Sequence, residues 1–214
     1  HAVPEGVPPD HAALTEPTSI ATRAVFDRST TTPGDTVLVE GPGPIGVLTA
    51  VVADGMGANV VVSGLAKDER YRLPLVESLG IETVNTGEAD LDDVVETATD
   101  GIGFDVVFDT TGHRSGVEMA ADAVRKGGGI VAVGLPGEPS ELFMTPLVRG
   151  EIDLNTSYGS VWRNFEQALR LMEAGEVPIK EIVDDSFSAD DPVAAFEAFL
   201  DAETLKPVFR FGDR

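Results

Sequence analysis

The sequence predicts an α/β protein with a doubly wound, six-stranded parallel sheet, and three observations predict it. Short β-branched apolar runs alternate with helical stretches over about 140 residues. A glycine-rich turn with the pattern G-x-G-x-x-G, residues 41–46, joins the first apolar run to an apolar helix. A second apolar run follows at 59–63, so the turn lies inside a strand-helix-strand unit.

The chain before this unit predicts an irregular segment and one helix. Residues 1–13 carry three prolines and little periodicity. Residues 12–26 place Ala, Leu, Ile and Val on one helical face, and Pro17 fits the first turn, where its missing N–H does no harm. Residues 31–35 then form a turn into the first strand.

The alternation itself gives the order of the remaining elements. Asp90 is a candidate N-cap of one helix, and Gly175 a candidate C-cap of another. The expected strands are 36–40, 59–63, 82–85, 104–109, 130–133 and 151–156, and the expected helices are 44–56, 68–80, 90–97, 115–125 and 162–174. Residues 176–214 do not continue the pattern, although 182–187, 191–200 and 207–211 suggest a strand, a helix and a strand.

Each glycine of the turn has a physical role in a Rossmann fold. Gly41 permits the tight turn, Gly43 lets a pyrophosphate approach the backbone, and Gly46 lets the helix lie close to the strand. Pro44 and Ile45 then open a helix whose free N–H groups favour phosphate. The pattern predicts dinucleotide binding; the alternative is a purely structural turn.

Composition excludes several classes of function. The 214 residues carry 37 Asp and Glu against 15 Lys and Arg, a net charge of −22, and no cysteine. Disulfides and thiolate metal sites are therefore excluded within these residues, and nucleic acid is not an expected partner because phosphate binding needs a basic surface. No apolar run approaches a membrane span and no signal peptide opens the chain, so we expect a cytoplasmic protein without membrane contact.

The acids are scattered, and only four of the cations are lysine. This composition resembles that of proteins from salt-accumulating halophiles, because molar salt screens mutual repulsion to a Debye length of about 3 Å. An acidic face for a basic partner is the alternative, which the scattering disfavours.

Several motifs together resemble the zinc-dependent branch of the medium-chain dehydrogenase/reductase family, which includes alcohol, sorbitol and threonine dehydrogenases. The likeness covers nearly the whole chain. The motifs are Leu14-Thr15-Glu16-Pro17, the nucleotide turn at 37–46, the strand ends at 105–112 and 127–135, and Leu205-Lys206-Pro207-Val208.

The resemblance implies a division of the chain. Residues 1–30 resemble the linking helix from a catalytic domain, 31–175 the Rossmann domain, and 176–214 a segment that returns to the catalytic domain. In the family that catalytic domain is GroES-like and carries a Cys and a Gly-His-Glu motif as zinc ligands, which this sequence lacks. We therefore expect exposed apolar surface on the C-terminal segment, and a homodimer or homotetramer in the intact enzyme.

The family likeness assigns one catalytic residue. Glu16 resembles the glutamate that lies at the zinc, directly or through water, since zinc accepts carboxylate oxygen. The alternative is an ordinary glutamate at a helix start. One carboxylate cannot supply three ligands, so we do not expect this chain alone to bind zinc stably.

The end of the second strand bears on the choice of cofactor. An NAD-preferring fold places an acid there for the ribose hydroxyls, whereas this chain has Gly64. Lys67 and Arg70 follow and are expected to pair with a 2′-phosphate, although Asp68 and Glu69 are possible ribose ligands. NADP is therefore expected, with NAD as the alternative. The other interpretation of Lys67 and Arg70, as solvated helix residues without a ligand, stays open.

The remaining cofactor contacts follow from the resemblance alone. The ends of the fourth and fifth strands flank the nicotinamide half, and a basic residue of the last strand reaches the pyrophosphate. These residues are Thr111, Gly112, Val133, Gly134, Leu135 and Lys206. Plain strand-to-loop turns and a surface lysine are the alternatives.

These observations point to the cofactor-binding portion of an NAD(P)-dependent alcohol or polyol dehydrogenase. The implied reaction is hydride transfer between the substrate carbinol carbon and the nicotinamide. A zinc-free quinone or enoyl reductase of the same family is the first alternative, and Glu16-Pro17 disfavours it. A non-catalytic dinucleotide-binding module is the second.

Overall fold

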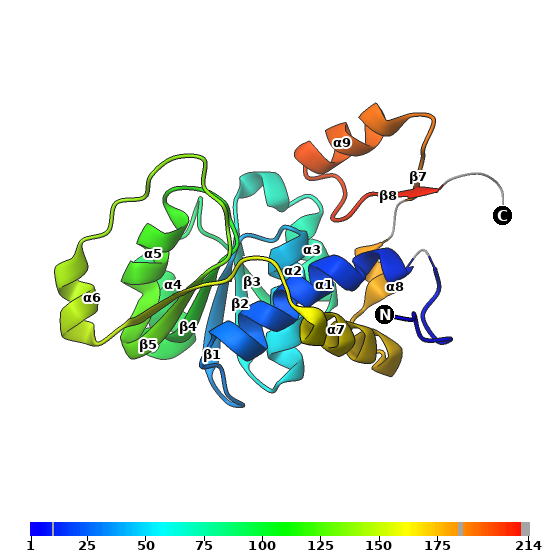
Figure 1. Cartoon of the computed structure of the whole chain (residues 1–214). Coiled ribbons are helices and arrows are strands. Elements are labelled where there is room, and N and C mark those ends of the chain that lie inside the picture. The colour runs from blue at the N-terminus through cyan, green and yellow to red at the C-terminus, as the bar shows by residue number, and fades with distance from the viewer. Residues whose placement is uncertain (10, 184–185, 211–214) are drawn as a thin grey trace.

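The computed structural model describes residues 1–9, 11–183 and 186–210, and a single six-stranded sheet dominates it (Figure 1). The strand order is β3-β2-β1-β4-β5-β6, and every neighbouring pair is parallel. The six-stranded parallel sheet expected from the sequence is confirmed. The strands are β1 (Thr36–Glu40), β2 (Asn59–Gly64), β3 (Glu82–Asn85), β4 (Phe104–Asp109), β5 (Val124–Ala132) and β6 (Asp153–Thr156).

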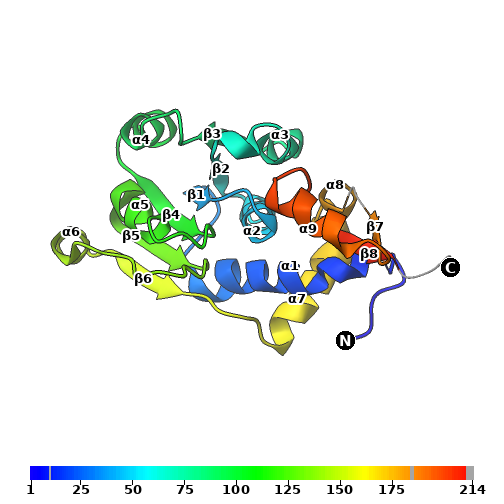
Figure 2. The ribbon, with the colours of Figure 1, turned by 90° about the horizontal axis from the view of Figure 1, so that it is seen from above.

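Helices cover both faces of the sheet, as the view from above shows (Figure 2). On one face Val37 and Val39 pack with α2 (Pro44–Gly55), and on the other Leu38 packs with α4 (Leu91–Thr99) and α5 (Gly116–Ala123). Because alternate residues of a strand face opposite sides, a strand buried on both faces reads as a continuous apolar run. This is why 36–40 and 59–63 are recognisable as central strands.

The N-terminal helical segment packs across the first face. It consists of η1 (His11–Leu14), α1 (Thr15–Thr22) and the π-helical turn η2 (Arg23–Asp27), close to the helix expected at 12–26. It lies against α2 and α7 (Trp162–Ala174). Asp27, at the end of η2, joins this segment to α7, because its carboxylate pairs with Arg163 and accepts a hydrogen bond from Asn164 Nδ2 at 2.9 Å.

Several expected boundaries were wrong. The expected helix 115–125 ends at Ala123, because Val124 already pairs with Phe104 of β4 and extends β5 toward its amino end. The expected helix 68–80 divides into η3 (Ala66–Asp68) and α3 (Arg72–Ser78). Strand β6 starts at 153 instead of 151, and helix α6 (Met144–Gly150) was not expected.

The C-terminal segment lies near the carboxyl ends of the strands (Figure 1) and packs against the main core through Ile179, Ile182 and Leu205. Where a strand was expected at 182–187, helix α8 (Ile179–Ile182) precedes β7 (Ser186–Ser188), and residues 184–185 lie outside the described residues. Helix α9 (Pro192–Leu200) follows, and β8 (Val208–Arg210) pairs with β7; Phe211 of the expected last strand is also outside the description. Exposed apolar surface is confirmed on α9, where Phe196 is 60% and Leu200 73% exposed.

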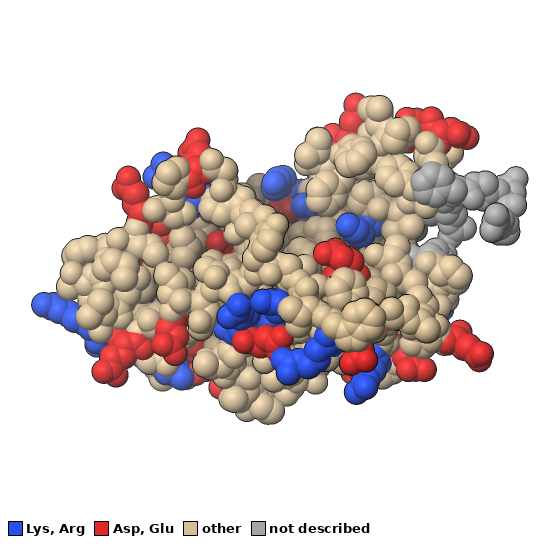
Figure 3. All heavy atoms as spheres, in the orientation of Figure 1, with Lys and Arg blue, Asp and Glu red and all other residues tan. Residues whose placement is uncertain are grey.

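The net charge of −22 makes the protein strongly acidic. On the face drawn in Figure 3, Asp and Glu side chains are spread over several elements and do not gather in one patch. Within the described ranges no helix has the length and apolar character needed to cross a bilayer.

Candidate nucleotide site

A cleft runs along the carboxyl ends of the strands. It consists of a cavity of about 570 Å³ over β1 and β2 and one of about 430 Å³ over β4, β5 and β6. Ile45, Thr110, Thr111 and Gly112 line both cavities, so the two are adjacent. In open α/β sheets ligands bind at this edge, where the strand order reverses between β1 and β4.

The glycine turn is packed as a pyrophosphate cradle requires. A Cβ at position 46 would overlap the Gly41 carbonyl oxygen and lie 2.6 Å from Thr110 Oγ1. Gly41 has φ +94°, a conformation that residues with side chains rarely adopt. A Cβ at Gly43 would meet nothing within 4 Å, so that part of the turn faces open space. The turn is tight on the protein side and open on the ligand side.

Helix α2 begins directly at this opening. Gly43 is extended and Pro44 is the first helical residue, where a missing N–H is harmless. Ile45 follows, and both Pro44 and Ile45 line the cavity. The N-terminal N–H groups and the helix dipole favour an anion there.

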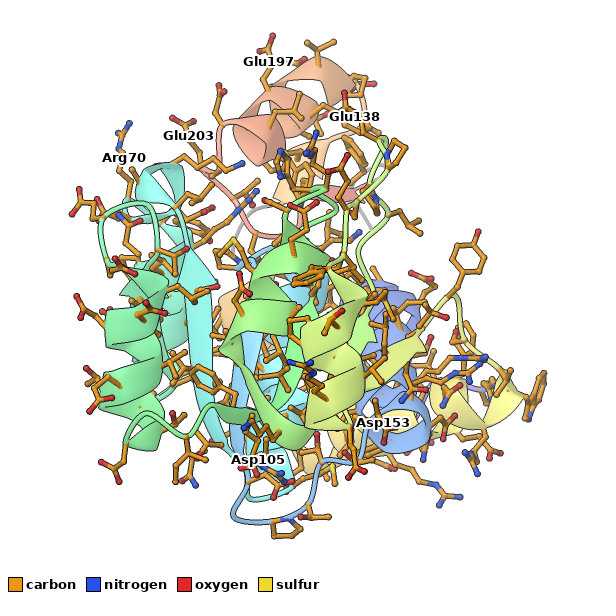
Figure 4. All side chains as sticks on the ribbon, turned by 90° about the vertical axis from the view of Figure 1, so that its left-hand side faces the viewer. Arg70, Asp105, Glu138, Asp153, Glu197 and Glu203 are labelled. Atoms are coloured by element: carbon orange, nitrogen blue, oxygen red, sulfur yellow. The ribbon has the colours of Figure 1, made fainter. Side chains whose placement is uncertain are left out.

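The end of β2 is closely packed against two apolar side chains. A Cβ at Gly64 would lie 2.9 Å from Leu73 Cδ2 and 3.0 Å from Pro42 Cγ. Lys67 is exposed and lines the cavity. Arg70 does not line it; Figure 4 shows this side chain at the outer edge of the loop, pointing away from the sheet.

The two acids near Gly64 already have partners. The Leu65 N–H donates to Asp68 Oδ2 at 3.0 Å, and Asp68 Oδ1 lies 3.6 Å from Arg72 Nη1. Asn85 Nδ2 donates to Glu69 Oε1 at 2.7 Å. Each carboxylate would have to give up a contact in order to bind a ribose.

Arg72 is a cleft residue that sequence reasoning missed. It is 7% exposed, lines the larger cavity and donates to the Phe199 carbonyl oxygen at 2.7 Å. Burial lowers the pKa of Arg72, and the Asp68 carboxylate opposes that shift. This guanidinium therefore fastens the end of α9 beside the cavity, and Phe199 is part of the cavity wall. The only sequence signal was a basic residue two positions beyond Arg70.

Glu40 is a second residue of the cavity whose role the sequence did not indicate. It ends β1 directly before the glycine turn, is 1% exposed and lines the larger cavity. Burial, and secondarily the nearby Asp109 carboxylate, raise the pKa of Glu40 well above its usual range.

The smaller cavity brings together the residues assigned by likeness to the nicotinamide half. Glu16 of α1 belongs to its wall and is the one acid among the described residues of that lining. Gly134 lies so close to Gly112 that a Cβ there would overlap the Gly112 amide nitrogen. The predicted cofactor and metal-side residues in this wall are Glu16, Ile45, Thr111, Gly112, Val133, Gly134 and Leu135. Ser157, which was not predicted, and Tyr158 also line it. Lys206 is half-buried and lines neither cavity.

The described residues do not fit a zinc ion. No group of three or more His, Cys, Asp or Glu side chains is placed to hold a metal in the described ranges. The sequence has no cysteine, and a catalytic zinc takes three protein ligands. Among the described residues, Glu16 alone therefore supplies too few ligands for a zinc site.

Comparisons with known proteins agree with this geometry. The zinc-binding dehydrogenase family matches residues 44–174. A sorbitol dehydrogenase from Halalkalibacterium halodurans is 33% identical over 96% of this chain and 60% of its own length. A putative D-xylulose reductase from Agrobacterium fabrum is 32% identical over 94% of this chain and 57% of its own.

The structural match is equally extensive. An alcohol dehydrogenase from Thermus sp. ATN1 superposes with a TM-score of 0.90 at 25% identity, over 98% of this chain and 62% of that one. The chain thus spans about 60% of the length of the curated relatives it matches. By its sequence, its sheet order and its glycine turn, this chain belongs to the zinc-binding dehydrogenase family and forms the part of it that carries the nucleotide fold.

Proposed function

We propose that this chain binds NAD(P) in the cleft at the strand ends and serves an enzyme that oxidises an alcohol or polyol by hydride transfer to the nicotinamide. The observation that carries the proposal is the glycine turn, closed against Gly41 and Thr110 at position 46 and open at Gly43. The relatives named for sorbitol and xylulose support a small polyol as the substrate. When bound, the nicotinamide supplies the hydride chemistry, and this chain orients it.

Within this proposal NADP is the preferred cofactor and NAD the alternative. Gly64 puts no acid at the end of β2, and a side chain there meets Leu73 and Pro42. The nearby acids at 68 and 69 are already engaged by neighbouring groups. Lys67 is an exposed cation of the cavity wall that suits a 2′-phosphate. Arg70, which points away, does not support that role in this conformation.

A direct titration tests the proposal. NADPH and NADH are added separately to the chain in molar KCl, and nicotinamide fluorescence is followed. We expect both to bind and NADPH to bind more tightly. Lys67→Met should remove most of the preference, whereas the matched Arg70→Met should leave it unchanged. Equal affinity of the wild type for both nucleotides would refute the NADP preference alone, and absence of binding would refute the nucleotide site.

A zinc-dependent reaction requires ligands that the described residues do not supply. We keep Glu16 as the proposed metal-side carboxylate of the complete enzyme, because it lines the same cavity as Gly134 and Leu135. The zinc-free quinone or enoyl reductase and the plain binding module are the rival functions. Assay of the natural protein that contains this chain, with and without zinc, distinguishes the three.

The proposal includes self-association through β6. In the described sheet this strand pairs only with β5, and its Leu154 is exposed. The neighbouring α6 exposes Val148, and Phe143 before it is 76% exposed. An open edge beside exposed apolar side chains favours pairing with a second copy as a homodimer or homotetramer. Light scattering of the wild type and of Leu154→Lys tests this pairing.

The acidic, lysine-poor composition supports a cytoplasm of high salt concentration as the location of the protein. Dependence of folding on molar salt is the measurable consequence, because screening of the scattered acids would then be part of what holds the chain folded.

A further inference from the structure

The carboxyl group of Glu40 has no partner in the described part of the protein. Both of its oxygens are buried and make no hydrogen bond, and the residue is 1% exposed. Buried polar groups in folded proteins are almost always paired, since leaving one unpaired destabilises the fold. Because Glu40 also lines the larger cavity, a ligand bound there is in a position to supply the missing partner.

The strand geometry fixes where this carboxyl lies. Residues of β1 alternate between the two faces, so Glu40 shares the face of Leu38, on the side of α5. Its in-register neighbours are Ser63 of β2 and Asp109 of β4. The larger cavity, over the strand ends of β1 and β2, also includes Thr86 after β3. Glu40 thus lines the half of the cleft away from the cavity over β5 and β6.

Among the described residues no cation neutralises Glu40. Arg72 is paired with Asp68 and the Phe199 carbonyl, and Asp109 Oδ1 accepts the N–H and the hydroxyl of residue 111 at 2.9 and 2.7 Å. A carboxyl that keeps its proton has one O–H to donate and needs an acceptor. The titratable and charged side chains that line this cavity with Glu40 are Lys67, Asp68, Arg72 and His113, and Asp109 lies beside it.

We propose that Glu40 is a nucleotide-contacting residue, whose carboxyl group donates a hydrogen bond to a ring nitrogen or ribose oxygen of the adenosine half of the dinucleotide. This inference rests on the proposed function. Binding then requires the protonated carboxyl, because an ionised one presents only acceptors and repels the pyrophosphate. Affinity should therefore fall as pH rises through the raised pKa of Glu40, by up to about tenfold per pH unit.

The test measures NADH and ADP-ribose binding from pH 5.5 to 9 in the His113→Asn background, which removes the cavity histidine. Neither probe carries a phosphate monoester, whose own titration near pH about 6 would confuse the profile. Glu40→Gln keeps an N–H donor that does not titrate. Glu40→Leu removes the donor and the charge at similar volume.

With Glu40 intact, the affinity for both probes should fall with rising pH. Glu40→Gln should bind with a flat profile, and Glu40→Leu at least tenfold more weakly than Glu40→Gln at every pH. Identical pH profiles for the parent protein and Glu40→Gln, or full affinity in the leucine variant, would overturn the inference while the nucleotide site stands. A parent protein that binds neither probe nor NADPH at any pH would instead overturn the proposed function. Circular dichroism confirms folding, and Glu40→Gln suffices to decide if the leucine variant does not fold.

Discussion

Replacing Gly46 by alanine tests the central structural argument, that helix α2 lies as close to the glycine turn as backbone contact allows. The added Cβ would overlap the Gly41 carbonyl oxygen and lie 2.6 Å from Thr110 Oγ1. A backbone carbonyl cannot rotate away as a side chain does. Moreover, Thr110 Oγ1 donates to the Glu40 and Gly41 carbonyl oxygens at 2.7 and 3.0 Å, so the turn must open and disturb these bonds.

The magnitude follows from two opposing effects. Glycine to alanine in a helix gains about 1 kcal/mol, whereas overpacking a close contact costs about 1–3 kcal/mol or more. Since the overlap involves backbone, we place the cost at the upper end and expect a net destabilisation of about 2 kcal/mol. Gly55 ends the same helix and is exposed, and a Cβ added there would meet nothing within 4 Å. Gly55→Ala should therefore be neutral or stabilise by up to about 1 kcal/mol.

Urea unfolding in molar KCl, followed by far-ultraviolet circular dichroism, measures both variants. NADPH titration of each folded variant measures how well the glycine turn still binds the nucleotide. We expect a difference of about 3 kcal/mol between the two variants, and at least tenfold weaker nucleotide binding for Gly46→Ala alone. Equal stability and equal affinity in the two alanine variants would refute the close-approach argument.

Three further predictions concern charge. Arg72→Met should destabilise the protein by about 3 kcal/mol, because buried Asp68 loses its cation and the Phe199 carbonyl loses its donor. The double variant with Asp68→Asn should recover part of this loss, and equal unfolding midpoints for the wild type and Arg72→Met would contradict the prediction. Glu40 keeps a raised pKa when folded, so stability should fall as pH rises above about 4.3, and Glu40→Gln should flatten that part of the unfolding profile. With a net charge of −22, the unfolding midpoint should rise as KCl is raised from dilute to molar concentration, and a midpoint independent of salt would exclude the screening explanation.

The layers of the fold were predictable because burial on both faces leaves its mark on the local sequence. Central strands such as 36–40 are apolar over most of their length, and a helix that follows a glycine turn has few alternatives. Boundaries set by pairing were not predictable. Val124 is a strand residue only because Phe104 lies opposite it in β4. Local helix preference alone had extended the expected helix through this position to 125.

The same distinction between local sequence and long-range contacts applies to the candidate site. Sequence alone was enough to identify the glycine turn, the absence of an acid at Gly64 and the lack of cysteine, because each depends only on residue type and position. The folded chain was needed to show that Arg72, and not Arg70, lines the cleft, since the chain direction within 66–78 turns one inward and the other outward. It alone showed Glu40 to be buried and unpaired, because the strands β2 and β4 on either side of it are distant in the chain. Residue types are local, whereas burial and pairing arise from contacts between distant segments.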